Sequence, residues 1–296
     1  MSKKDSWVGK CDLCFERRRP NEKLTIQHGS FNAPFKLMKT TNNVDGRCEV
    51  PLLHTAGGLI GGDELKLNVK LRPESTGLIT TVAAQKVYGT VGRSNRHPEG
   101  LWAKQFCNFH IDEHADLEWI PQELIIFEGG LYEQNMQVRL NPKASFLSTE
   151  IVRLGRTSAG ETLGNGCWRS KVEVSRNSGN SMNWEFIDQL EFQGDSLVSE
   201  NGLDNKPVLG SLLWIAPDNL SDIKIEQLIK VCRSLKQGLE GTMTCSSINK
   251  GLSARYLGKS TQEARLCFLR IWSHIRETNN LSSPKNLRVW PLQEYN

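Results

Sequence analysis

The feature that constrains this chain most is a strict alternation of apolar and polar residues that recurs along its first two thirds. Residues 65–71 alternate leucine and valine with lysine and asparagine without a break. Because every second side chain of a β-strand points to the same face, this period of two predicts a strand with one buried face. Residues 107–111 and 171–175 repeat the pattern, and residues 78–82 and 146–152 add β-rich runs. Short turn clusters separate these segments, which is typical of an all-β layered architecture.

The last third of the chain follows a helical period instead. Apolar residues between positions 225 and 239 recur at steps of three and four, and Gly238 and Gly241 mark the expected end of that helix. Residues 260–263 read Ser-Thr-Gln-Glu, a capping box that predicts the start of a second helix. We therefore expect a single domain over residues 1–296, with a strand-rich body to about residue 216 and a helical C-terminal segment from about 217 to 296.

Composition and charge limit the classes of partner. The net charge is only +4, and Lys and Arg are not concentrated as they are in nucleic-acid-binding proteins. No stretch approaches the roughly 18 apolar residues that a membrane helix requires. Residues 1–7 are charged and lack the apolar core of a secretory signal. We expect a cytoplasmic protein that binds neither nucleic acid nor membrane.

The sequence contains no GxSxG or HExxH motif, and its glycine-rich segment lacks the Gly-Lys-Ser/Thr end of a phosphate-binding loop. Eight cysteines include one CxxC pair, Cys11 and Cys14, and the six histidines form no tract. A tetrahedral site needs more ligands than one such pair provides. The sequence therefore predicts no tight metal site.

A glycine-rich loop carries the most distinctive local chemistry. Its glycines are Gly57, Gly58, Gly61 and Gly62. Glycine allows positive φ and close approach of another chain segment. The loop is interpreted either as a rigid turn that presents His54, Asp63 and Glu64 to a cavity or a partner, or as a tight turn with a solvated acidic end. Both interpretations stay open.

Asp188 is a second unusual position. It falls on the same predicted strand face as Trp184, Phe186, Leu190 and Phe192. Burial of an unpaired carboxylate costs several kcal/mol, on the order of 2–7 for a polar group. Asp188 therefore needs an ion-pair or amide partner, a bound cation or water.

Four blocks, in this order and spacing, resemble the UreD (UreH) family of urease accessory proteins. They are residues 33–36 with 53–65; residues 78–88; residues 117–123 with 155–161; and residues 254–258 with the helix end at 272–276 and the closing 288–290. The matching motif residues are Gly57, Gly58, Gly61, Gly62, Thr81, Lys86, Tyr88, Pro121, Gln122, Gly155, Arg156, Gly160, Arg255 and Trp290. One departure is that Thr55 and Ala56 stand where the family usually has proline before the glycines.

The resemblance implies an accessory protein and not an enzyme. Members bind urease apoprotein and UreF, recruit the GTPase UreG through UreF, and assemble as a dimer of UreD–UreF–UreG heterotrimers. The resemblance also implies a stacked-sheet, β-helix-like body with two C-terminal α-helices, and an internal water-filled channel for transient Ni²⁺, with no tightly bound cofactor.

Oxygen ligands exchange Ni²⁺ faster than thiolate or imidazole cages, so such a channel would be lined by carboxylates. The candidates for the nickel path are Asp63, Glu64, Glu161, Asp188 and His54. For each of them a cap, a turn hydrogen bond or a salt bridge is the alternative role. Two other functions stay open: a hydrolase that uses a carboxylate pair such as Asp63 with Glu161, and a purely structural adaptor with no ion passage.

Overall fold

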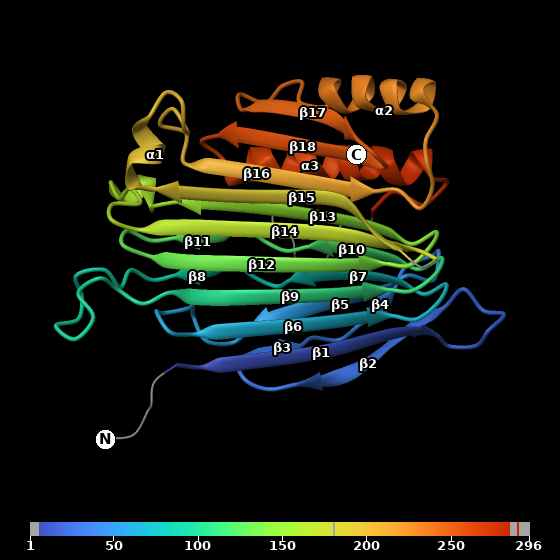
Figure 1. The fold of residues 1–296 in the computed structure, drawn as a ribbon, viewed down its shortest axis with the longest axis horizontal. Coiled ribbons are helices and arrows are strands. Elements are labelled where there is room, and N and C mark those ends of the chain that lie inside the picture. Colours follow the sequence, from blue (N-terminus) through green and yellow to red (C-terminus); the bar gives the residue numbers. More distant parts are fainter. Residues whose placement is uncertain (1–5, 180, 285–288, 290–296) are drawn as a thin grey trace.

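The strands of this chain form two sheets that lie face to face (Figure 1), as a computed structural model of residues 6–179, 181–284 and 289 shows. In spatial order, the first sheet contains β15 (Ser181–Gln193), β14 (Cys167–Ser178), β12 (Leu131–Leu140), β9 (Ala103–Ile111), β6 (Glu64–Leu71), β1 (Val8–Arg17) and β2 (Thr25–Phe31). Five of them, β1, β6, β9, β12 and β14, run parallel to one another.

The second sheet is larger and extends to the C-terminal part of the chain. In spatial order, it contains β17 (Thr242–Ile248), β18 (Gly251–Gly258), β16 (Val208–Ile215), β13 (Ser145–Leu154), β10 (Asp116–Ile120), β7 (Thr76–Thr81), β5 (Cys48–His54) and β3 (Phe35–Leu37). Three short strands attach to it: β4 (Thr41–Asn42), β8 (Gln85–Val87) and β11 (Leu124–Ile126).

From β5 to β14 the chain passes back and forth between the two sheets, and each pass adds a strand parallel to the one before it. At the ends, β2, β3, β15, β16, β17 and β18 pair antiparallel, so both sheets are mixed. The prediction of a mostly-β, stacked-sheet fold is confirmed, whereas a β-helix-like body is not confirmed.

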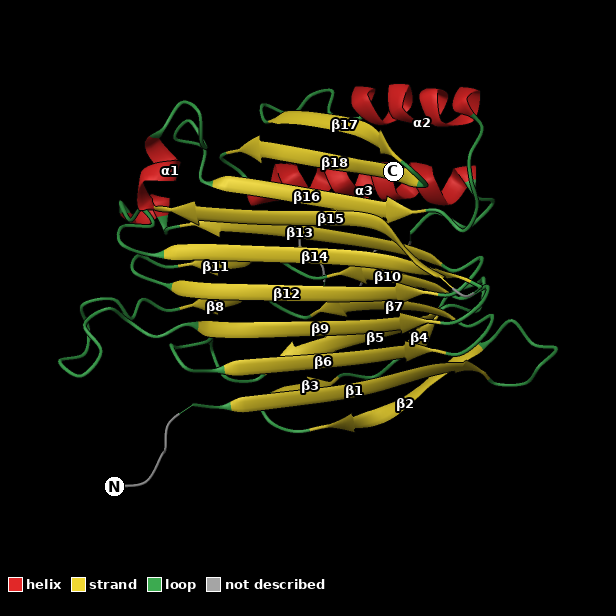
Figure 2. Ribbon diagram, viewed as in Figure 1, coloured by secondary structure: helices red, strands yellow, loops and turns green. Residues whose placement is uncertain are grey.

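Two helices cover the outer face of the second sheet (Figure 2). These are α2 (Asp222–Ser234) and α3 (Thr261–Thr278), whose apolar stripes pack with the outer face of that sheet in one cluster. A sheet buried on both faces reads as a near-continuous apolar run, while a sheet with one solvated face alternates. Accordingly β10 is buried at four successive residues, whereas β6 alternates buried and partly exposed residues along its whole length. None of the helices in the described part of the chain has the length and apolar character of a membrane span.

The region expected to be helical holds the two predicted helices and also the β17–β18 hairpin between them. The first helix ends at Ser234, earlier than the glycines that were expected to mark its end. Arg270 donates hydrogen bonds to the carbonyls of Leu235 and Gln237, so these acceptors are satisfied without another helical turn. A third, short helix, α1 (Gly194–Val198), follows β15 and was not predicted.

The predicted start of the second helix is confirmed. Ser260 is the N-cap of α3, and its hydroxyl accepts a hydrogen bond from the Glu263 N–H at 3.2 Å. The Glu263 carboxylate does not complete the box. It accepts hydrogen bonds from the Gly241 N–H and the Tyr256 hydroxyl, and thereby ties the helix start to the β17–β18 hairpin.

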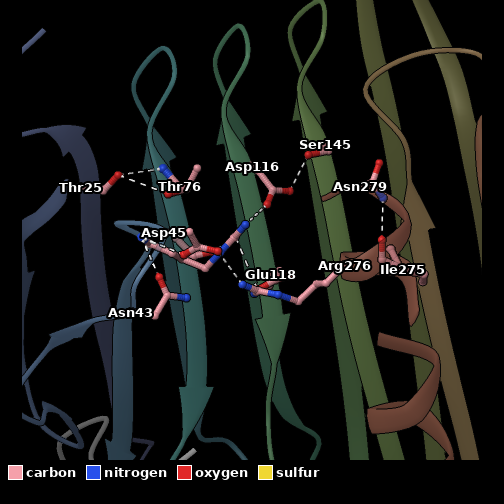
Figure 3. A network of polar contacts seen from close by, with 12 residues as sticks. Thr25, Asn43, Asp45, Thr76, Asp116, Glu118, Ser145, Ile275, Arg276 and Asn279 are labelled. Atoms are coloured by element: carbon pink, nitrogen blue, oxygen red, sulfur yellow. Dashed lines mark hydrogen bonds and ion pairs between the residues drawn. The ribbon is translucent and has the colours of Figure 1, made fainter. Parts of the chain in front are cut away.

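A buried ionic network anchors the other end of α3 (Figure 3). Arg276 is 2% exposed, and its guanidinium contacts Glu118 of β10 at 2.8 Å and Asp45 at 2.9 Å. Arg47, 1% exposed, contacts Glu118 at 3.5 Å and also binds Asp116. Arg276 therefore has a structural role, because its ion pairs connect the end of α3 to other parts of the same chain.

Candidate functional site

The two sheets do not fill the space between them. They enclose a cavity of about 460 Å³ that side chains from both sheets line. Its wall is largely apolar, with Leu65 and Met136 from the first sheet and Trp119 from the second. Small residues, Ser211 and Ser253 among them, face the cavity from the second sheet, where larger side chains would otherwise fill the core.

Glu150 is the central polar group of this cavity. It projects from β13 and accepts hydrogen bonds from Gln134 Nε2 at 2.8 Å and from Ser170 Oγ at 3.2 Å, both on the opposite sheet. Burial raises the pKa of Glu150 to about 7, and nearby Asp188 adds to the shift while Ser170, Arg255 and Gln134 oppose it. Near neutral pH this carboxyl is therefore poised between its neutral and charged forms.

Asp188 lines the same cavity from β15. It forms an ion pair with Arg255 of β18, and Arg255 also donates to the Ser211 hydroxyl on β16. The ion pair therefore joins the first sheet to the second across the cavity wall. Of the partners expected for a carboxylate at this position, the structure supplies an arginine.

The face predicted for β15 is wrong at one residue. A register shift opposite Val174 and Ser175 places a bulge in the β14–β15 pair, because Phe186 pairs with Val174 and Trp184 with Ser175. A bulge inserts one residue and reverses the alternation beyond it. Trp184 is therefore 53% exposed, while Phe186 lines the cavity as expected.

Glu185, the extra residue at the bulge, takes the buried position. It contacts Arg176 at 2.8 Å and Lys250 at 3.2 Å, and its side chain is 3% exposed.

One end of the cavity reaches the surface at the glycine-rich loop. Gly57, Ala83 and Lys86 line the cavity and are exposed, so they mark a mouth. The Tyr88 hydroxyl donates to the Gly57 carbonyl at 3.2 Å, and a Cβ on Gly58 would lie 2.7 Å from the Tyr88 ring. The missing side chain of Gly58 therefore lets the tyrosine close over the loop.

Motif residues that are far apart in the sequence meet around this cavity. Those that line it are Gly57, Gly58, Thr81, Lys86, Pro121, Gln122 and Arg255. Two of these blocks bond directly, since the Gln122 N–H donates to the Thr81 hydroxyl at 2.8 Å. Part of each of the four blocks that carry the family resemblance thus lines one cavity.

His54 stands beside the mouth and lines the cavity. Its Nε2 is buried and has no hydrogen-bond partner among the described residues. Burial lowers the pKa of His54, with Asp63 and a hydrogen bond to the Ala56 backbone opposing the shift. A neutral imidazole that uses one nitrogen on a backbone carbonyl keeps the other free as a ligand.

Asp63 and Glu64 lie outside the cavity lining. Both Asp63 oxygens accept backbone hydrogen bonds, from the Trp7 N–H at 3.0 Å and from the Ile60 N–H at 2.9 Å. Asp63 is 7% exposed, so it closes the glycine turn from inside. Glu64 points to the outer face of β6, where it contacts Lys66 at 3.1 Å.

Glu161 also lies elsewhere, on a surface loop with Gly155 and Gly160. Its carboxylate forms a two-bond ion pair with Arg156, and the hydrogen bonds from Arg156 lower the pKa of Glu161. The Arg156 guanidinium in turn lies 4.5 Å above the Phe127 ring. These motif residues form a surface ion pair that packs on an aromatic ring.

The remaining motif residues lie elsewhere. Gly61 and Gly62 shape the turn next to Leu101, and Trp290 lies outside the described residues.

Of the five predicted path residues, the structure brings Asp188 and His54 to the cavity and adds Glu150, which the sequence analysis missed. The available signal was weak: Glu150 is the one charged residue inside the apolar and hydroxyl-bearing run 146–152. No group of three or more His, Cys, Asp and Glu side chains in the described ranges is arranged to hold a metal ion.

Comparison with known proteins identifies the chain. The family described as UreD urease accessory protein matches residues 8–291. A urease accessory protein UreD of Prochlorococcus marinus (strain MIT 9303) is 51% identical over 292 residues, which cover 97% of this chain and 98% of the relative. The UreD of Synechococcus sp. (strain CC9311) is 49% identical over 295 residues, covering 100% of this chain and 99% of the relative. The chain therefore belongs to the UreD family of urease accessory proteins.

Proposed function

We propose that this urease accessory protein is a maturation scaffold that passes Ni²⁺ through its internal cavity to urease apoprotein. In this proposal it is not an enzyme. It acts in the cytoplasm, binds urease apoprotein and UreF, and recruits the GTPase UreG through UreF, within a dimer of UreD–UreF–UreG heterotrimers. One observation carries the proposal: the family motifs and two interior carboxylates converge on a single cavity.

The ligand chemistry suits a cargo that must leave again. Glu150 and Asp188 offer oxygen ligands inside the cavity, and His54 offers one imidazole nitrogen beside the mouth. Ni²⁺ accepts both ligand types, and a few oxygen ligands hold it more weakly than a thiolate or imidazole cage. An ion would meet these groups in turn, so transient binding follows without a tight site.

The hydrolase alternative loses its proposed residues. Both Asp63 oxygens are used by backbone N–H groups, and Glu161 is paired with Arg156 on the surface. Neither side chain lines the cavity, so they do not share a cleft in which a substrate would lie between them. The structural adaptor remains the second candidate, because every cavity carboxylate is also bonded to the opposite sheet.

A paired-variant experiment separates passage from adaptor. The double variant Glu150→Gln, Asp188→Asn removes both interior charges and keeps the side-chain volumes. We expect UreF and urease apoprotein still to co-purify with it, while the nickel content of urease falls roughly tenfold or more. The matched control is Glu64→Gln, Glu161→Gln, which removes two carboxylates outside the cavity and should leave urease nickel unchanged.

The outcomes are distinct. Full nickel content of urease with the cavity variant would rule out the passage and leave the adaptor. If the unaltered chain co-purifies with neither UreF nor urease, the proposed scaffold function is wrong.

A further inference from the structure

The ion pair at the cavity wall differs from those of the buried arginines Arg47, Arg176 and Arg276, each of which also donates to a backbone carbonyl. Arg255 is held by two side chains, Asp188 and Ser211, and by no backbone carbonyl among the described residues. Its side chain is 30% exposed and that of Asp188 is 23% exposed. Because both border an open space, the guanidinium has room to leave its partner.

Arg176 shows what a structural arginine looks like in the same fold. It pairs with Glu185 at 2.8 Å, and both side chains are 3% exposed. Its guanidinium also donates to the backbone carbonyls of Asn141, Ala144 and Ala216. A guanidinium bound to several fixed carbonyls has one stable position, whereas one bound to two side chains at a cavity can exchange partners.

Arg255 also acts on both interior carboxylates. It is bonded to Asp188, and its positive charge opposes the upward pKa shift of Glu150. Arginine stays protonated at any physiological pH. One fixed positive charge therefore faces the two groups that an incoming cation would use.

We propose that Arg255 is a tethered counter-cation that holds the Glu150–Asp188 site when it is empty and selects divalent over monovalent cations. The inference rests on the proposed passage of Ni²⁺. A monovalent ion attracts the Asp188 carboxylate no more strongly than the guanidinium already does, and it must also lose part of its hydration shell. A divalent ion doubles the Coulomb attraction and displaces the arginine. When the ion moves on, Arg255 returns, so the site does not retain its cargo.

The test is Ni²⁺ binding to the full-length chain by equilibrium dialysis, with potassium ions in excess. In Arg255→Met the tethered competitor is gone, so we expect Ni²⁺ to bind roughly tenfold tighter, and potassium to compete more strongly than in the unaltered protein. Arg255→Lys keeps the charge and should stay close to the unaltered protein. The matched control is Arg169→Met, which breaks the Arg169–Glu191 pair between β14 and β15 outside the cavity and should leave Ni²⁺ binding unchanged.

If Arg255→Met does not fold, Ser211→Ala replaces it, because this change loosens the tether without removing the charge. It should tighten Ni²⁺ binding in the same direction. Suppose that the folded Arg255 or Ser211 variant binds Ni²⁺ like the unaltered protein, while Glu150→Gln and Asp188→Asn weaken binding. Arg255 would then have only a structural role, and the proposed passage of Ni²⁺ would not be contradicted. Unchanged binding in all the cavity variants, with full urease nickel, would overturn the passage as well.

Discussion

At the scale of single residues, each candidate carboxylate is defined by what its oxygens contact. Asp63 accepts two backbone N–H groups, Glu161 pairs with an arginine on the surface, and Glu150 faces a cavity through two neutral donors. Asp188 is paired with Arg255, but it lines the same cavity as Glu150, whereas Asp63 and Glu161 do not. The two interior carboxylates, Glu150 and Asp188, are therefore the ones on which the proposed passage depends.

Glu150 should make stability depend on pH. Its pKa is raised from 4.5 to about 7 in the folded protein, mainly by burial. The stabilisation from its neutral form is full below about pH 4.5 and is lost as pH rises through about 7. About 3 kcal/mol of unfolding free energy should disappear across that window. Urea unfolding at pH 5 and pH 8 measures it, and Glu150→Gln should lack this component; an identical pH dependence in both proteins would contradict the shift.

Asp63 should prove structural. Asp63→Ala leaves the Trp7 and Ile60 N–H groups without their acceptor, which should lower the unfolding free energy by about 1–2 kcal/mol. The neighbouring Glu64→Ala removes only an exposed pair with Lys66 and should change it by less than about 0.5 kcal/mol. Denaturant unfolding compares the two variants. Equal effects would mean that the turn does not depend on Asp63.

At the scale of elements, α3 stabilises the second sheet. Its apolar stripe packs on the outer face of that sheet, and its last turn inserts Arg276 between Glu118 and Asp45. The Trp272 indole N–H donates to Glu118 as well, at 2.8 Å. Burial raises the pKa of Glu118, while Arg47 and Arg276 oppose the shift and support its charged form.

Replacing one member of this ionic network should lower the unfolding free energy more than replacing two members together. Arg276→Met leaves Glu118 buried without one of its counter-ions, and should lower the unfolding free energy by about 3–5 kcal/mol. Glu118→Gln added to it removes the uncompensated charge and should restore part of that loss. Thermal unfolding of the two single variants and the double variant gives the coupling. Strictly additive losses would show that the residues do not act as a network.

At the scale of the whole molecule, the cavity exists because two sheets close over each other without filling the space between them. Its wall comes from strands between β3 and β18, so no fragment of the chain contains it. The mouth comes from fewer elements. It is built by the glycine-rich loop after β5, by the segment between β7 and β8, and by β8 itself.

A plug at the mouth should therefore separate assembly from passage. Ala83 is exposed and lines the mouth, so Ala83→Trp should leave unfolding unchanged to within about 0.5 kcal/mol, as expected for a surface position. UreF and urease should still co-purify, while urease nickel should fall several-fold. The matched control is Ala159→Trp, at an exposed residue on the loop after β13. It should leave both the unfolding free energy and the urease nickel content unchanged. Full nickel loading with the plug would argue against this mouth as the route.

The sequence by itself determined strands β6, β7, β9, β13 and β14, the two late helices, the capping serine and the family, because each depends on local periodicity or on motif order. It also placed Asp188 on an inward face. Only the tertiary structure decided that Glu150, Asp188, Arg255 and His54 share one cavity. Period two fixes the face to which a side chain points, but strand order and register decide which faces meet. The bulge that turned Trp184 outward has the same origin, since it arises in pairing between strands.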